Sequence, residues 1–225
     1  DSLSQRMDEY QKMGATFSKW RAIININNLN ASDYCIDLNA FYLARYARIV
    51  QNFNMVPIVE PEVLMDGNHS IDDCYDVTSR ILKSVFKQLS FHGVFLEGIL
   101  LKPNMIISGN NSNDQSDVKE ISKKTIKCLS ENVPIEVPGI VFLSGGQSNE
   151  LATKNLNEIN KTKNLPWKLS FSYGRALQQP VIKTWSGENK NTEKAQKELF
   201  KRAKLNSLAT EGKYEDEMEF LKNEL

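Results

Sequence analysis

Short apolar runs alternate with longer segments of helical spacing along the chain. The runs begin near Phe17, Met55, Phe95, Gly139 and Leu169. Between and after them, apolar residues recur on one side of a helix, and the spacing predicts helices over about 33–51, 71–91, 116–131, 149–162 and 192–207. Strands that are each followed by a helix are typical of repeated βα units and a parallel sheet. The pattern therefore predicts an α/β fold.

Leu3, Met7 and Tyr10 recur at helical spacing ahead of the first run, so we expect an opening helix with no strand before it. Five βα units fit two architectures. One is an open sheet of five strands, and the other is the later part of an eight-stranded (β/α)8 barrel whose first three units are absent. The asparagine-rich stretch 110–117 is expected to be a surface loop. We expect a single domain over 1–225, with a C-terminal tail over 208–225.

Composition narrows the class of protein. The 225 residues are 40% hydrophobic, which is enough for a sizeable core. Lysine plus arginine equals aspartate plus glutamate at 28 each, so no overall charge attracts nucleic acid or a membrane surface. No apolar stretch reaches the roughly 18 residues of a membrane span. We therefore expect a soluble protein with no nucleic acid or membrane partner.

Cysteine and histidine are scarce. The three cysteines, Cys35, Cys74 and Cys128, lie far apart without C-x-x-C spacing, which favours buried thiols in a reducing compartment over disulfides or a zinc site. We expect a cytoplasmic location. His69 and His92 are the only histidines, too few for typical metal-dependent hydrolysis or aldol chemistry. We expect neither a metal nor a cofactor.

Charged residues stand where the first three strands are expected to end. Lys19 and Arg21 are two residues apart, so they share one face of a strand and form an anion site. Glu60 and Glu62 have the same relation and supply two carboxylates for proton transfer; alternatively they begin a solvated loop or pair with the two cations. Lys102 follows an apolar run, where lost hydration favours the neutral amine that attacks a carbonyl. A lysine ending a strand is otherwise a surface residue.

Two glycine-containing turns follow the fourth and fifth runs. Glycine lets backbone N–H groups approach an anion, and a following helix adds the positive end of its dipole. Each turn taken alone also fits an ordinary βα connection. Because the carboxyl ends of parallel strands share one edge, we expect all five strand ends to converge on one active site. The residues assigned to a phosphate pocket there are Ser144, Gly145, Gly146, Ser172, Gly174 and Arg175.

Five segments together resemble the class I fructose-bisphosphate aldolases. They are FSKWR at 17–21, VPIVEPE at 56–62, LLKPNM at 100–105, FLSGGQS at 142–148 and FSYGRAL at 171–177. The resemblance runs from about residue 1 to residue 214. It implies a (β/α)8 barrel of which this chain holds about five C-terminal βα units, and a metal-independent glycolytic lyase that assembles as a homotetramer.

The resemblance also implies a role for each matched residue. Lys102 would form the Schiff base with a phosphorylated ketose, and Glu60 would be the general acid and base. Glu62 would hold Lys102, Lys19 would stabilise developing charge, and Arg21 would face the aldehyde-side phosphate. The ketose-side phosphate would be bound by the six residues of the two turns, Ser144, Gly145, Gly146, Ser172, Gly174 and Arg175.

Two other functions fit the same residues. The chain is alternatively a non-catalytic scaffold that binds phosphorylated ligands or proteins through the basic site. The third possibility keeps the Schiff-base chemistry and changes the substrate to another phosphorylated ketose, because the motifs recognise phosphate and carbonyl groups but not sugar length.

Overall fold

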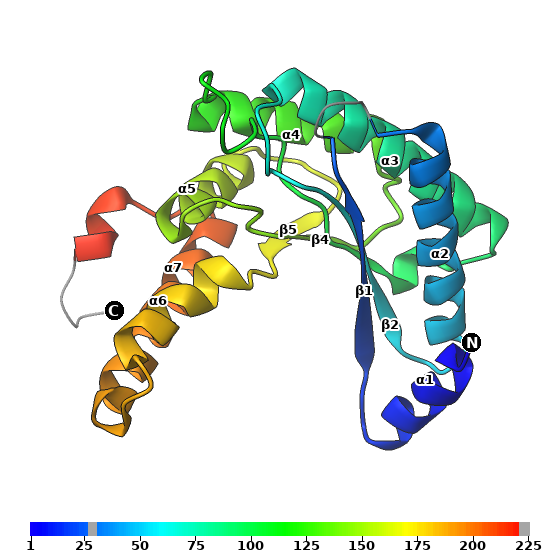
Figure 1. Ribbon diagram of the computed structural model, residues 1–225, viewed down its shortest axis with the longest axis horizontal. Helices are drawn as coiled ribbons and strands as arrows, with labels where there is room; N and C mark the ends of the chain where they lie inside the picture. The colour runs from blue at the N-terminus through cyan, green and yellow to red at the C-terminus, as the bar shows by residue number, and fades with distance from the viewer. Residues whose placement is uncertain (27–30, 221–225) are drawn as a thin grey trace.

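The computed structural model describes residues 1–26 and 31–220. Its five parallel strands lie in the order β1-β2-β3-β4-β5 (Figure 1). The strands are β1 (Phe17–Ile24), β2 (Val56–Val63), β3 (Leu100–Leu101), β4 (Gly139–Phe142) and β5 (Lys168–Phe171). The α-helices are α1 (Leu3–Lys12), α2 (Asp33–Gln51), α3 (Ile71–Phe91), α4 (Val118–Asn132), α5 (Asn149–Asn160), α6 (Arg175–Trp185) and α7 (Thr192–Thr210). The predicted βα succession and parallel sheet are confirmed.

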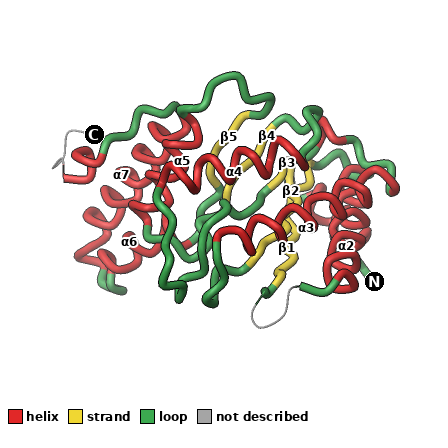
Figure 2. Tube along the Cα trace, turned by 90° about the horizontal axis from the view of Figure 1, so that it is seen from above, coloured by secondary structure: helices red, strands yellow, loops and turns green. Residues whose placement is uncertain are grey.

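Helices α2 to α5 cover one side of the sheet. Figures 1 and 2 show them in an arc, with the strands along its inner side. We call the side of the sheet that faces α2 to α5 the helix face, and the opposite side the inner face. Short 3-10 turns, Leu96–Gly98, Asn189–Asn191 and Asp216–Phe220, complete the described elements. No helix within the described ranges is long and apolar enough to cross a membrane.

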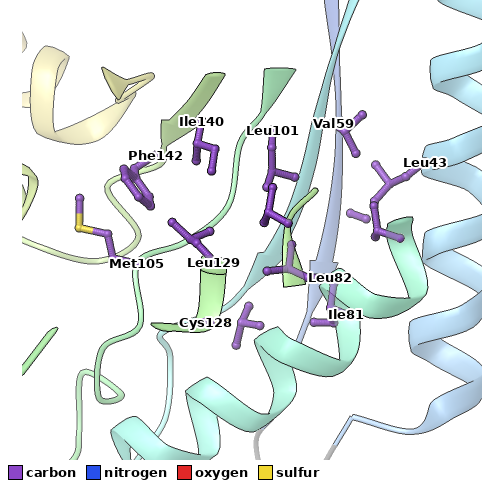
Figure 3. Packing of buried hydrophobic residues seen from close by; sticks show 14 of the residues in the cluster. Leu43, Val59, Ile81, Leu82, Leu101, Met105, Cys128, Leu129, Ile140 and Phe142 are labelled. Carbon is purple, nitrogen blue, oxygen red and sulfur yellow. The ribbon is translucent and has the colours of Figure 1, made fainter. Parts of the chain in front are cut away.

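The main core lies between the helix face and the helices. Val59, Leu101 and Ile140 project from neighbouring strands and are fully buried. Figure 3 shows them facing side chains of the helix layer, among them Leu43 of α2 and Leu82 of α3. Burying each such side chain contributes about 1.5–3 kcal/mol. This packing fixes which residues of each strand are left to point to the inner face.

Successive side chains of β1 and β2 point to opposite faces of the sheet, so the charged residues lie on the face opposite to the helices. Ser18 and Trp20 face α2, where Ser18 shares a hydrogen bond of 2.8 Å with the Tyr46 hydroxyl and Trp20 packs on the Tyr46 ring. Burial raises the pKa of Tyr46. Lys19 and Arg21 therefore point to the inner face, as their spacing predicts.

The third strand begins later than expected. A start near Phe95 is wrong, because Leu96–Gly98 forms a 3-10 turn and β3 begins at Leu100. The Gln51 side chain of α2 accepts a hydrogen bond from the Phe95 backbone N–H and donates one to its carbonyl oxygen. These contacts hold the segment against the helix instead of the sheet. The starts of β2 and β5 differ from expectation by one residue each, at Val56 and Lys168.

Helix α6 was not expected from the sequence. It contains Pro180, which cannot donate a backbone hydrogen bond, so the segment lacks a clear helical signal. The opening helix α1 and the five predicted helices are confirmed, with α2 and α3 at their expected limits and the others within three residues. Helix α7 ends at Thr210, two residues beyond the expected start of the tail at 208. Residues 221–225 of that tail lie outside the described ranges.

Candidate active site

Four charged side chains of β1 and β2 form two ion pairs on the inner face. Lys19 Nζ lies 2.7 Å from Glu60 Oε2, and Arg21 Nε donates a hydrogen bond to Glu62 Oε2. The Glu62 bond raises the pKa of the Arg21 guanidinium. Glu60 and Glu62 are only 3% and 4% exposed, and buried carboxylates need such partners to remain ionised.

Lys102 brings a third cation to Glu60 from the end of β3. Its Nζ lies 3.3 Å from Glu60 Oε1, and the residue is 8% exposed. The backbone N–H of Lys102 donates to the Val59 carbonyl oxygen at 2.8 Å, which extends the β2–β3 pairing by one hydrogen bond. Glu60 thus bridges Lys102 and Lys19. Among the described residues no donor is aligned for a hydrogen bond with Glu60 Oε2, although the Lys19 charge is close.

Glu62 has a different partner from the one expected. We expected it to hold Lys102, but the described partner of Lys102 is Glu60, and Glu62 binds Arg21. The contacts of both carboxylates match the alternative interpretation, in which they form ion pairs with Lys19 and Arg21. Lys102 is nevertheless buried beside a carboxylate, so its interpretation as an exposed surface lysine does not hold.

The turn after β4 contains two glycines in left-handed conformations. Gly145 and Gly146 have φ angles of 35° and 74°, in the region that favours glycine. Ser144 is buried, and Ser148 caps α5 by accepting a hydrogen bond from the Leu151 backbone N–H at 3.1 Å. The turn leads directly to the positive end of α5.

The turn after β5 lies beside it. The Ser172 backbone N–H donates to the Phe142 carbonyl oxygen at 2.9 Å, so this turn follows a strand paired with β4. Gly174 is the N-cap residue of α6, and Arg175 begins that helix with its side chain exposed. The two glycine turns therefore follow neighbouring strands and each opens a helix.

The loops after β2, β3 and β4 contact one another. The Asn110 backbone N–H donates to the Met65 carbonyl oxygen at 2.7 Å. A β-carbon at Gly146 would collide with the Asn110 side chain, and one at Gly145 would lie against Met65. The expected convergence of these strand ends is thus visible. Sequence reasoning placed Asn110 in a surface loop and gave no signal of its contact with the glycine turn.

No metal centre is apparent in the described ranges. Within residues 1–26 and 31–220, no three His, Cys, Asp or Glu side chains come together as a group able to hold a metal ion. The charged groups on the inner face instead alternate in sign, with three cations around two carboxylates. Such an arrangement suits binding of an anionic molecule and proton transfer next to an amine.

The chain is similar to known aldolases over nearly its whole length. The family model described as "Fructose-bisphosphate aldolase class-I" matches residues 1–224. A probable fructose-bisphosphate aldolase class 1 of Xanthomonas campestris is 50% identical over 215 residues, covering 95% of this chain and 64% of that protein. Fructose-bisphosphate aldolase 4, cytosolic, of Arabidopsis thaliana is 52% identical, covering 95% of this chain and 55% of that protein.

A solved structure agrees with these relatives. Fructose-bisphosphate aldolase of Plasmodium falciparum, in complex with TRAP and a small-molecule inhibitor, superposes with a TM-score of 0.93 at 49% identity. The match covers 96% of this chain and 62% of that one, so the chain spans less than two thirds of the relatives it matches. The fold is the later part of an aldolase barrel, as expected. The family model, the relatives and the superposition together show that this chain belongs to the class I fructose-bisphosphate aldolase family.

Proposed function

We propose that this chain carries the Schiff-base machinery of a fructose-bisphosphate aldolase. The reaction is the reversible cleavage of fructose 1,6-bisphosphate into glyceraldehyde 3-phosphate and dihydroxyacetone phosphate in glycolysis. The observation that carries the proposal is the buried Lys102 Nζ, 3.3 Å from Glu60 Oε1. Membership of the aldolase family supports the choice of substrate.

Imine formation needs proton transfers to and from the reacting groups, and Glu60 is the carboxylate beside the Lys102 amine. It takes a proton from Lys102, whose free electron pair then attacks the ketone carbon. The extra proton on the nitrogen moves to the new alkoxide oxygen, which gives a neutral carbinolamine. The carboxyl group returns a proton to the carbinolamine hydroxyl, which leaves as water. The resulting iminium is an electron sink. When a base takes the proton of the hydroxyl on the departing carbon, the carbon–carbon bond breaks, the aldehyde leaves and an enamine remains on Lys102.

The surrounding charges fit a phosphorylated substrate. Lys19, Arg21 and Lys102 together carry one positive charge more than Glu60 and Glu62, which favours binding of an anion. Lys19 stabilises the charge that develops next to the imine, Arg21 faces the aldehyde-side phosphate, and Glu62 holds Arg21 in place. Backbone N–H groups of the two turns hold the ketose-side phosphate with Arg175. The residues of this phosphate pocket are Ser144, Gly145, Gly146, Ser172, Gly174 and Arg175.

Reductive trapping tests the proposal. The chain is incubated with dihydroxyacetone phosphate and sodium borohydride, which reduces the imine to a stable amine, and the labelled residue is found by peptide mass mapping. We expect one adduct on Lys102. Lys102→Met should abolish it, while Lys168→Met, which changes an exposed lysine at the start of β5, should not. An unlabelled chain, or label spread over surface lysines, would contradict the proposal.

Two further measurements separate the other two functions. A non-catalytic scaffold would bind dihydroxyacetone phosphate without forming an adduct, which equilibrium dialysis with the radiolabelled compound detects. A preference for another phosphorylated ketose would appear as faster trapping with a monophosphate than with fructose 1,6-bisphosphate. Each outcome identifies one function, because imine formation and phosphate binding are measured separately.

We also propose a cytoplasmic location and assembly as a homotetramer. The location is supported by a relative that is named as cytosolic. Assembly is supported by large apolar side chains exposed on the surface, such as Tyr34 at 76%, Phe91 at 82% and Phe95 at 63%. Multi-angle light scattering measures the mass in solution, and a monomer at micromolar concentration would contradict the tetramer.

A further inference from the structure

The pairing between β2 and β3 ends just where the reactive groups stand. Its registered pairs are Ile58 with Leu100 and Val59 with Leu101. Extending that register by two residues places Pro61 opposite Pro103, and neither proline has a backbone N–H to donate. Among the described residues, the bond from Lys102 to Val59 is therefore the last of this strand pairing, and the next backbone bonds between the two segments lie in the loops, such as Asn110 to Met65. Directly after that bond, a contact other than backbone hydrogen bonding between β2 and β3 must hold the two strand ends together.

The Asn104 side chain connects the two strand ends beyond this point. Its Oδ1 accepts a hydrogen bond from the Val63 backbone N–H at 3.0 Å, which ties the chain after Lys102 to the residue after Glu62. Its Nδ2 donates to the Met105 carbonyl oxygen at 3.0 Å and to the Thr78 hydroxyl of α3 at 3.2 Å. Asn104 is 2% exposed, so these bonds are shielded from water. One amide thus joins β2, the extension of β3 and α3.

We propose that Asn104 is a positioning residue that holds Lys102 beside Glu60. Lys102 and Glu60 lie on different strands, and their 3.3 Å contact depends on how those strands end. Two residues after Lys102, the Asn104 amide fixes that end through a bond that no backbone group supplies. Displacement of a reacting group by about 1 Å costs roughly 100-fold in rate. The proposal rests on the proposed function for its kinetic consequence, and the geometry is testable without it.

The chain offers a closely matched control. Asn132 of α4 is buried, and its Nδ2 donates to the Cys128 carbonyl oxygen at 2.7 Å and to the Ser79 hydroxyl at 3.3 Å. Asn104 and Asn132 thus donate to the same kinds of group. They differ at Oδ1, which accepts from Val63 in Asn104 and has no partner among the described residues in Asn132. Alanine at either position removes a similar buried amide, but only one change frees the strand ends.

The kinetic test measures borohydride trapping with dihydroxyacetone phosphate in the unaltered chain, Asn104→Ala and Asn132→Ala. We expect Asn104→Ala to lower the rate at saturating substrate by about tenfold or more, with less than about a threefold change in the half-saturating concentration. Asn132→Ala should stay within about twofold on both measures. Equal rates in the two variants, or a loss confined to substrate affinity, would overturn the proposal.

A second pair of variants decides the matter if Asn104→Ala does not fold. Thr78→Val removes the hydroxyl that holds the Asn104 amide, and Ser79→Ala removes the hydroxyl that holds Asn132. We expect the first to slow trapping and the second to leave the rate unchanged. A Thr78→Val rate equal to that of Ser79→Ala would overturn the proposal.

Amide hydrogen exchange tests the geometry without any chemistry. In Asn104→Ala, or in Thr78→Val if that variant replaces it, the backbone N–H groups of Val63 and Lys102 should exchange faster, and in Asn132→Ala they should not. Unchanged protection at Lys102 would overturn the proposal even if Val63 responds. If the unaltered chain forms no adduct, the proposed function fails, and exchange at Lys102 still decides whether Asn104 positions it.

Discussion

Lys102 Nζ lies 3.3 Å from one oxygen of Glu60, and Lys19 Nζ lies 2.7 Å from the other. A single buried carboxylate therefore stands between two cations from strands β1 and β3, with β2 in the middle. The arrangement places an amine and a carboxylate in an ion pair before any substrate arrives. The two cations offset the cost of burying the Glu60 carboxylate.

Replacing this carboxylate should slow imine formation. Glu60→Gln keeps the shape of the side chain but cannot accept the Lys102 proton, so we expect borohydride trapping about 100-fold slower, still on Lys102. Glu62→Gln is the control, because Glu62 binds Arg21 and not Lys102 among the described contacts. Trapping rates measured by quantitative peptide mapping give both values. A larger loss in Glu62→Gln would contradict the assignment of Glu60.

Removing the guanidinium at the start of α6 should weaken binding more than chemistry. A hydrogen bond to a charged phosphate contributes about 1.5–3 kcal/mol, so Arg175→Ala should raise the half-saturating concentration of dihydroxyacetone phosphate by about tenfold or more. The trapping rate at saturation should change little. Lys183→Ala on the same helix is the control. An unaltered affinity with a lower maximal rate would contradict the phosphate role.

The positions of the charged residues follow from strand alternation, but their pairing does not. Two-residue spacing places Lys19 with Arg21, and Glu60 with Glu62, on one face of the sheet. The register then sets Arg21 opposite Glu60, yet its guanidinium reaches past to Glu62 and leaves Glu60 to Lys19 and Lys102. Such choices depend on side-chain reach and on the neighbouring strand, which spacing along one strand does not encode.

The helices and strands likewise divide into those that the sequence pattern predicts and those that it does not. Long periodic segments such as Ile71–Phe91 are predictable because burial of one face and a capping residue agree, here Ser70 with Asp73. The start of the short strand β3 is not predictable in this way. The apolar run begins at Phe95, but hydrogen bonds from Gln51 hold Phe95 against α2 and outside the strand. Helix α6 is hidden by Pro180, whose cost is offset by packing against α7 that no local pattern reveals.

Acid should destabilise the protein through His69. The residue is 8% exposed, and burial lowers the pKa of its imidazole below the ordinary 6.5. Neither ring nitrogen has a hydrogen-bond partner among the described residues, and Asp73 of α3 is the charged group that acts on the ring. As the pH falls below 6.5, the unfolded chain binds a proton that the folded chain does not, so the free energy of unfolding falls. The free energy of unfolding stops falling for this reason once the pH is below the pKa of His69 in the folded protein.

Urea unfolding at about pH 7.5 and about pH 5.5 measures this effect. The unaltered chain should lose stability between the two, and His69→Phe should lose less, because an apolar ring at that position has no proton to bind. A pH dependence of equal size in both proteins would show that other groups cause it.

Breaking the buried ion pair between α7 and the following turn should be costly. Arg202 is 1% exposed, and its Nη1 lies 2.6 Å from Glu219 Oε2. Glu219→Ala leaves the guanidinium buried without its partner, and we expect a loss of about 3–5 kcal/mol in the free energy of unfolding. Adding Arg202→Met to that variant should restore much of the loss, because no unpaired charge then remains.

Chemical denaturation of the two variants measures this coupling. The exposed pair of Lys213 with Glu211 provides the control, since water already solvates both groups, and Lys213→Ala should leave stability unchanged. A double variant less stable than Glu219→Ala alone would contradict the account of an uncompensated buried charge.

Gly109 lies where the loops after β2 and β3 meet. A β-carbon there would collide with the Gly67 carbonyl oxygen and with His69 Nδ1, and the next two backbone N–H groups donate to Met65 and Gly67. The loops after β2 and β3 are thus joined backbone to backbone, and opening of either one must break hydrogen bonds that it shares with the other. We expect the two loops to open together, so that their backbone N–H groups exchange with solvent at similar rates.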